Sequence, residues 1–361
     1  MRRARRLTLA APPPDPFGER RRPALRLSLQ LLGARFDFET DSARLLRVVA
    51  SAYAGLPPQR FAPRPPRFRI RLLTIPGAGA RRAQPPPVRP LAGAGLLAGA
   101  LDGASFVALE PRRRAALLVV APELLRRTYH LRYELLEFAV YVLAARAQRL
   151  VPLHAACVGQ GGDGVLLIGA SGAGKSTLVL HCLLAGLDLL AEDSVLVRPA
   201  GLRASGVASF LHLRPDALRF LTPATRRRVV QRAGLIRRRS GVQKLEIDVR
   251  GPRTFGAAQG RLARLPLRIR AVVFVSAARA AAGALLVPLD RSVALARLAA
   301  SQRYAASQPG WRQFRARVAA LPAYELRRGE HPAEAAAALR ALLAAPAKAA
   351  GRQRRRISMR K

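Results

Sequence analysis

The sequence predicts an α/β fold in which a small α+β domain precedes a larger α/β domain. Apolar and polar residues alternate near the N-terminus, a long helix follows, and beyond residue 150 the pattern becomes strand, loop, helix and strand. With 361 residues, half of them apolar, the chain is long enough for two domains, or for one large domain with an appendage. The expected division is a basic flexible tail over 1–24, the α+β domain over 25–122, the larger domain over 123–345 and a basic tail over 346–361.

The α+β domain is predicted from short alternating runs. Leucines alternate with polar residues over 25–31, which is typical of a half-buried strand, and "RFDFE" alternates again after Gly33. Asp41 or Ser42 can cap a helix that carries apolar residues from Leu45 onward. "FRIRLLTI" is another strand, and a loose stretch rich in Pro, Gly and Ala is expected over 76–104.

One continuous helix is predicted over 123–147, leading into the larger domain. Its apolar stripe consists of Leu125, Tyr129, Leu136, Val140 and Leu143. His130 on the same helix is interpreted as a packing or surface residue, and His212 and His331 stand in no motif.

The larger domain is predicted from apolar strands around one glycine-rich loop. "LVPLHAACV" and "GVLLIG" read as strands, "GKSTLVLHCLLAGL" as a helix ending near Gly186, and "DLLAEDSVLVRP" as the next strand. "LRIRAVVFVSA" is a further buried strand, and "EHPAEAAAALRALLAA" is a helix before the basic tail.

Composition narrows the classes of function. The net charge of +42 comes almost wholly from arginine, since only four lysines occur, and we interpret it as coding bias more than a binding footprint. Aromatic residues make up 5% of the chain, which speaks against a stacking platform for nucleic acid. Cys157 and Cys182 form no zinc or disulfide pattern, and no uncharged apolar run is long enough to span a bilayer. We expect a soluble, cytoplasmic protein without a transmembrane segment.

The strongest motif begins at Gly169 and fits the Walker A pattern G-x-x-x-x-G-K-[ST]. Its glycines let backbone N–H groups face phosphate oxygens, and the following helix adds the positive end of its dipole. Lys175 would reach the β- and γ-phosphates, and the Ser176 hydroxyl would coordinate Mg²⁺. The motif predicts ATP and Mg²⁺ as ligands. The predicted nucleotide-binding residues are Gly169, Ala170, Ser171, Gly172, Ala173, Gly174, Lys175, Ser176 and Thr177.

Two neighbouring acids, Glu192 and Asp193, lie on the strand predicted after the Walker A helix. One carboxylate could hold Mg²⁺ while the other accepts a proton from an attacking hydroxyl. Adjacent residues of a strand point to opposite faces, so both can serve one site only if the strand end is irregular. Solvated acids at a strand end remain the alternative.

The chain resembles the HPr kinase/phosphorylase family and its smaller relatives, the HPr-kinase-like serine kinases. "LHAACV", "GASGAGKS" and "LLAED" stand where that family has a histidine, a phosphate loop and an acidic pair. The resemblance implies a P-loop kinase domain of the HPr kinase and phosphoenolpyruvate carboxykinase type. It also implies catalytic roles for Lys175 and His154, Glu192 as general base where the family has Asp, and Asp193 at Mg²⁺. The clear resemblance covers roughly residues 130–200, and "KLEIDVRGPRTFG", with Lys244 and Glu246, is a loose echo of a later family signature.

The expected function is therefore an ATP-dependent kinase acting on a serine hydroxyl. The acceptor could be a protein, a peptide or free serine, and nucleic acid is not an expected partner. The resembled family includes hexamers, so a homo-oligomer is an open expectation. The alternative is a non-catalytic nucleotide sensor that regulates a partner protein. A transporter-type ATPase is disfavoured because no "LSGGQ"-like signature occurs.

Overall fold

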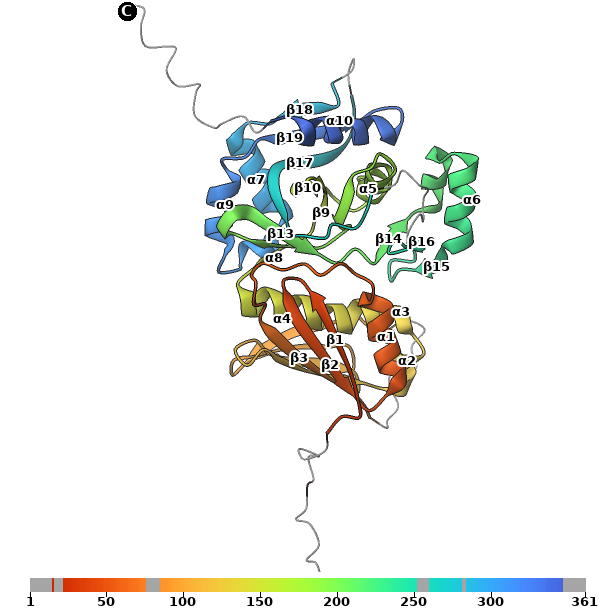
Figure 1. The fold of residues 1–361 in the computed structure, drawn as a ribbon, viewed down its shortest axis with the longest axis vertical. Helices are drawn as coiled ribbons and strands as arrows, with labels where there is room; N and C mark the ends of the chain where they lie inside the picture. Colours follow the sequence, from red (N-terminus) through yellow and green to blue (C-terminus); the bar gives the residue numbers. More distant parts are fainter. Residues whose placement is uncertain (1–14, 16–21, 76–84, 252–259, 281–283, 347–361) are drawn as a thin grey trace, which may run out of the picture.

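The computed structural model describes residue 15 and residues 22–75, 85–251, 260–280 and 284–346. The described chain is a mixed α/β structure with sheets of seven, nine and three strands (Figure 1). The predicted tails fall almost wholly outside the described residues, as does the stretch 76–84. No helix within the described ranges is long and apolar enough to cross a membrane.

The seven-stranded sheet is formed by the first part of the chain. Its order is β1 (Leu25–Leu31), β2 (Ala34–Thr40), β3 (Arg67–Thr74), β7 (Ala115–Val120), β6 (Phe106–Glu110), β5 (Leu96–Ala100) and β4 (Arg89–Gly93). Helix α1 (Ala43–Tyr53) is capped by Ser42, whose hydroxyl accepts a hydrogen bond from the Leu45 amide at 3.3 Å. The predicted strands 25–31 and 68–75 and the capped helix are confirmed.

The expectation of a loose stretch over 76–104 is wrong for residues 89–100. There β4 and β5 form a hairpin, joined by Ala94 and Gly95, which both have positive φ angles. Because β4 and β5 are rich in Gly and Ala, they lack the alternation of apolar and polar side chains from which a strand is predicted. β4 is also exposed along its whole length.

The helix predicted over 123–147 is interrupted. Arg127 has φ −110° and ψ 61°, outside the helical region, so the chain forms α2 (Pro122–Leu125) and then starts again. The second part runs through α3 (Thr128–His130), a π-helical turn η1 (Leu131–Leu136) and α4 (Glu137–Gln148). Of the predicted stripe, Leu125, Leu136, Val140 and Leu143 are buried in the core of the seven-stranded sheet, whereas Tyr129 is only partly buried.

The nine-stranded sheet holds the glycine-rich loop. Its order is β11 (Asp188–Ala191), β9 (Ala156–Gln160), β10 (Asp163–Ile168), β17 (Leu267–Arg279), β13 (Arg203–Gly206), β12 (Val195–Arg198) and β8 (Val151–Leu153). β19 (Ala323–Arg328) continues beside β17 and pairs with β18 (Leu286–Pro288).

Helices cover both faces of this sheet. One face packs against α5 (Lys175–Leu184) and α10 (Pro332–Ala344). The other face packs against α7 (Arg291–Ser301), α8 (Arg303–Ala306) and α9 (Trp311–Val318). The strand that precedes the loop is therefore buried on both sides, as its unbroken apolar run predicts.

Two predicted strands are each divided in the structure. The single strands predicted over 150–158 and 188–199 are wrong: β8 and β9 are separate, and so are β11 and β12. The first division falls at His154–Ala155 and the second at Glu192–Ser194. Each pair of strands occupies distant positions in the sheet, so the polar residues lie where the chain crosses between them.

The three-stranded sheet joins the two larger sheets. Its order is β14 (Phe210–Leu213), β16 (Gln243–Asp248) and β15 (Gly234–Arg237), and α6 (Pro223–Arg232) accompanies it. The 3₁₀ turns η2 (Ala200–Leu202) and η3 (Pro215–Phe220) lie in the neighbouring connections. Figure 1 shows this sheet next to α5 and above α1. The Ser209 hydroxyl donates to the Ala52 carbonyl and fixes that contact.

Candidate functional site

Three polar segments meet at one edge of the nine-stranded sheet. β10 and β11 both lie antiparallel to segments of β9, so their carboxyl ends share the edge at which β9 begins. Gly169 follows β10, Glu192 follows β11, and His154 shortly precedes β9. This is the edge at which α/β proteins commonly place ligands.

The loop from Gly169 to Gly174 has the geometry of an anion cradle. A Cβ atom at Gly169 would lie 2.9 Å from the Val275 carbonyl oxygen, so glycine is required there. Gly174 has a φ of +100° and directly precedes α5, whose first turn has no side-chain cap. The first amides of α5 therefore remain open to an anion.

Lys175 and Ser176 begin α5 and turn toward different partners. The Lys175 ammonium is buried and donates to the carbonyl oxygens of Gly169 and Ala170, the latter at 3.3 Å. The Ser176 hydroxyl donates to the carboxylate of Glu192. Burial alone would raise the pKa of Glu192, but hydrogen bonds from His212 and Ser176 hold it below its ordinary value. An ionised carboxylate beside a serine hydroxyl is an oxygen donor set that fits Mg²⁺.

Asp193 faces a different neighbour from Glu192. Its Oδ1 lies 3.3 Å from Nδ1 of His154, and both side chains are about half exposed. The His154 backbone is held by Gln302, which accepts from its amide at 2.8 Å and donates to its carbonyl at 3.1 Å. Glu192 and Asp193 lie in the break between β11 and β12, so the strand end is irregular at the two acids.

A buried chain of polar groups leads away from Glu192. His212 on β14 lies between two carboxylates, with Nδ1 3.2 Å from Glu192 Oε2 and Nε2 3.2 Å from Glu246 Oε1. Glu246 also accepts from Arg132 and, at 3.0 Å, from the Tyr133 hydroxyl. Burial would lower the pKa of His212, but its two carboxylate partners raise it. The pKa of Glu246 is lowered to about 2, since its hydrogen bonds and Arg132 outweigh burial.

These connected polar groups include residues that the sequence does not identify as part of a site. His212 stands in no motif, and it meets Glu246 only because β14 and β16 pair in a register that places them opposite each other. Lys244, two positions away on β16, is half-buried, and burial lowers its pKa. Lys244 and Glu246 are the two residues singled out in the segment "KLEIDVRGPRTFG". Glu246 is connected to Glu192 through His212, which lies between the two carboxylates.

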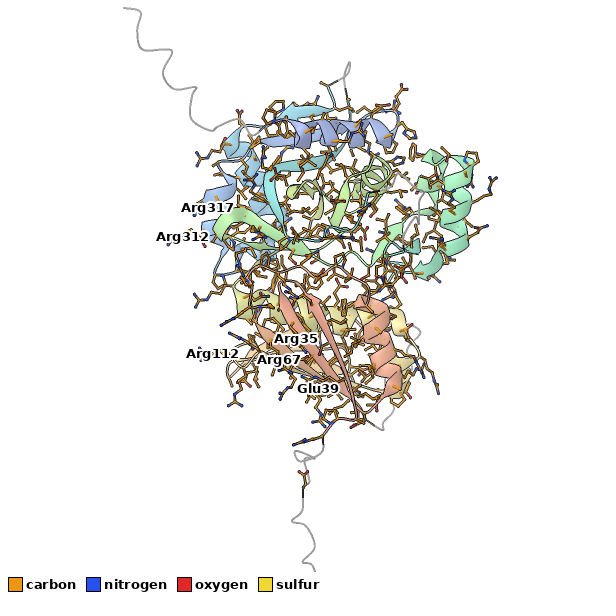
Figure 2. All side chains as sticks on the ribbon, viewed as in Figure 1. Arg35, Glu39, Arg67, Arg112, Arg312 and Arg317 are labelled. Atoms are coloured by element: carbon orange, nitrogen blue, oxygen red, sulfur yellow. The ribbon has the colours of Figure 1, made fainter. Side chains whose placement is uncertain are left out.

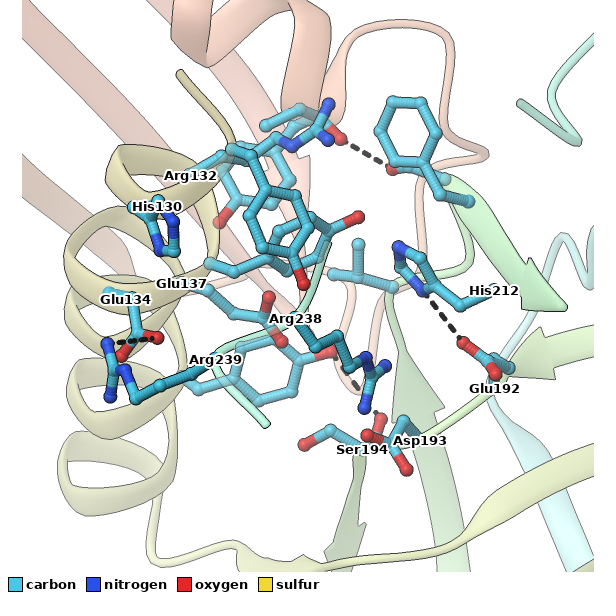
Figure 3. A pocket seen from close by; sticks show the side chains of 18 of the residues that line it. His130, Arg132, Glu134, Glu137, Glu192, Asp193, Ser194, His212, Arg238 and Arg239 are labelled. Atoms are coloured by element: carbon cyan, nitrogen blue, oxygen red, sulfur yellow. Dashed lines mark hydrogen bonds and ion pairs between the residues drawn. The ribbon is translucent and has the colours of Figure 1, made fainter. Parts of the chain in front are cut away.

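A cavity of about 440 Å³ lies between the helical segment that runs from α3 through η1 to α4 and the loop that carries Glu192 and Asp193. Figure 3 shows Glu134 and Glu137 on the helix side of this cavity, with Glu192, Asp193 and His212 on the other side. Burial, followed by the charge of Asp193, raises the pKa of Glu137 to about 7. The π-helical turn ends there, with the Glu137 amide donating to the Arg132 carbonyl.

Comparisons with known proteins add little to this geometry. The chain matches no protein-family model, and no curated protein matches its sequence. Among solved structures, the HPr(Ser) kinase/phosphatase from Coxiella burnetii is similar at 13% identity, over 53% of this chain and 89% of that one, with a TM-score of 0.27. A likeness this weak does not establish a shared fold.

Proposed function

We propose that the protein is an ATP- and Mg²⁺-dependent kinase that transfers the γ-phosphoryl group to an acceptor hydroxyl, with a serine-type hydroxyl as the expected acceptor. The observation that carries the proposal is the meeting of three groups at one sheet edge. These are the Walker A loop at the start of α5, the Ser176–Glu192 contact and the Asp193–His154 pair. The sequence resemblance to HPr-kinase-like serine kinases supports the same reaction.

The contacts favour a particular division of roles. The loop amides and Lys175 bind the phosphates, and Ser176 with Glu192 supplies oxygen ligands for Mg²⁺, which would neutralise charge on those phosphates. Asp193 lines the cavity and is open to it, so it accepts the proton when the acceptor oxygen attacks the γ-phosphorus. The bond to the ADP oxygen breaks in the same step. The sequence resemblance implies the opposite assignment of the two acids.

The test is transfer of label from γ-labelled ATP to hydroxyl acceptors, including free serine and serine-containing peptides. Wild type is expected to label at least one acceptor, and Lys175→Ala is expected to label none. Labelling that persists unchanged in Lys175→Ala would contradict the proposal.

The rival is a nucleotide sensor without catalysis. It predicts ATP binding with no transfer to any acceptor, and a Glu192→Gln variant that binds ATP and signals as wild type does. The kinase predicts that Glu192→Gln demands more Mg²⁺ for half-maximal transfer.

A further inference from the structure

Two oxygen-bearing side chains that line the cavity have no hydrogen-bond partner among the described residues, and the same holds for the buried Nδ1 of His130 and the Nε atoms of Arg132, Arg238 and Arg239. Tyr53, at the end of α1, is 97% buried, and its hydroxyl has no partner among the described residues. The carboxylate of Glu137, at the start of α4, likewise has no hydrogen-bond or ion-pair partner in the described part of the chain. Both residues line the cavity, and burial and the charge of Glu137 raise the pKa of Tyr53. Buried polar groups normally have partners, so the buried Tyr53 hydroxyl beside the partly buried Glu137 carboxylate indicates a ligand.

The charges around the cavity indicate the sign of that ligand. Arg239 pairs with Glu134 at 2.8 Å, and Arg132 pairs with Glu246. Figure 3 shows Arg238 pointing toward Asp193. Arg132 and Arg239 are thus engaged by other carboxylates, and among the described residues the Glu137 carboxylate forms no ion pair of its own, although the charges of His212 and Arg132 act on it.

A protonated amine would satisfy both orphan groups at once. It brings a positive charge to the Glu137 carboxylate, and its N–H groups can donate to that carboxylate and to the Tyr53 hydroxyl. The cavity of about 440 Å³ is of the size that takes small molecules. Its walls come from the α3–η1–α4 segment and from the loop that carries Glu192 and Asp193, so a ligand in this cavity lies next to Asp193.

We propose that this cavity is the acceptor site of the kinase and that the acceptor is a small amino alcohol, free serine included. Its ammonium group is held by Glu137 and Tyr53, and its hydroxyl is directed at Asp193. This inference rests on the proposed kinase function and names its substrate class. Tyr53 and Glu137 are positioning residues that act through the amine.

Binding of an amine must displace a proton near neutral pH. With a pKa of about 7, Glu137 is partly protonated in the empty cavity, and an ammonium neighbour favours its ionised form. The titratable and charged groups that line the cavity around Glu137 come from every surrounding element. They are Tyr53, Tyr129, His130, Arg132, Tyr133, Glu134, Tyr141, Glu192, Asp193, His212, Arg238 and Arg239.

Calorimetry on the full chain, loaded with Mg²⁺ and a non-hydrolysable ATP analogue, tests the inference. L-serine, ethanolamine and 3-hydroxypropanoate, which is serine without its amine, are titrated at pH 7 in two buffers of different ionisation enthalpy. We expect the two amines to bind with proton release, and 3-hydroxypropanoate to bind at least tenfold more weakly.

Variants separate the amine contact from general damage. Glu137→Gln is expected to weaken serine binding at least tenfold and to abolish proton release, with unchanged affinity for the ATP analogue. Tyr53→Phe is expected to weaken serine binding by a few-fold. Glu110→Gln, on the surface of β6, is the matched control and is expected to behave as wild type.

Several results would overturn the inference. These are equal binding of 3-hydroxypropanoate and serine, no binding of any amine at millimolar concentration, or unchanged serine affinity in Glu137→Gln. Phosphoryl transfer to acceptors without an amine would support the kinase and refute the amino-alcohol site. Amine binding with proton release but no transfer would support the site and refute the kinase.

Discussion

At the scale of single residues, Glu137 links the stability of the protein to pH. Its pKa is about 7 in the folded chain and 4.5 as an ordinary value, so the folded state binds more protons than the unfolded state between them. Stability contributed by the protonated form is present below pH 4.5 and is lost as pH rises through 7. The full loss corresponds to about 3 kcal/mol.

Glu137→Gln removes this dependence. We expect the variant to be more stable than wild type at pH 8 and nearly equal to it at pH 4.5, as measured by urea unfolding at both pH values. A stability difference that is the same at both pH values would show that Glu137 does not titrate in this range.

His212 is the second residue whose role can be tested singly. It lies between the carboxylates of Glu192 and Glu246, and its removal leaves both without their shared hydrogen-bond partner. Leaving a buried carboxylate without its partner costs about 3 kcal/mol. We expect His212→Ala to lower the free energy of unfolding by about that amount. His154→Ala is the matched control, because its half-exposed pair with Asp193 is worth about 1 kcal/mol at most.

At the scale of elements, phosphate binding by the loop before α5 is expected to depend on the backbone conformation of Gly174. Gly174 has a φ of +100°, which strains any residue with a Cβ atom. We expect Gly174→Ala to weaken ATP binding at least tenfold, measured by calorimetry. Gly103→Ala, at an open position without a positive φ, should leave ATP binding unchanged. Equal affinities for the two variants would argue against phosphate binding at this loop.

Elements also show which parts of the site could be predicted from sequence. The loop and the acids Glu192 and Asp193 lie within short segments, so local patterns are enough to predict that they belong to one site. The breaks at His154 and after Ala191 were missed because apolar residues continue on both sides. His212, Arg132 and Glu137 come together only through strand pairing and a π-helical turn, which no local periodicity reveals.

At the scale of the whole molecule, the sheets are joined by hydrogen bonds from the segment after α1. Buried Gln59 accepts from the Ser205 hydroxyl and the Gly206 amide, and donates to the Ala263 carbonyl at 3.3 Å. Arg250 and Arg198 donate to carbonyls of Ala54 and Phe61 at 2.9 and 3.2 Å. These bonds hold the first part of the chain against the nine-stranded sheet, and the cavity is lined by residues from both parts.

This contact should affect stability and acceptor binding together. Gln59→Ala leaves three buried polar groups without their partner, and we expect it to lower the free energy of unfolding by about 2 kcal/mol. It should also weaken serine binding while leaving ATP affinity unchanged. Chemical unfolding and calorimetry measure the two effects, and loss of ATP affinity alone would contradict this role.

The positive charge is spread over the molecule. Figure 2 shows Arg35, Arg67 and Arg112 around the seven-stranded sheet, and Arg312 and Arg317 on α9 beside the nine-stranded sheet. All five are exposed. Exposed arginines therefore occur on both large parts of the protein.

The most direct test of the central claim is the single-turnover rate of γ-phosphoryl transfer to serine, measured for wild type and Asp193→Asn at saturating Mg²⁺. The proposed site predicts that Asp193→Asn binds ATP as wild type does and transfers the phosphoryl group about 100-fold more slowly or worse. Transfer at the wild-type rate in this variant, or no transfer by wild type to any hydroxyl acceptor, would contradict it.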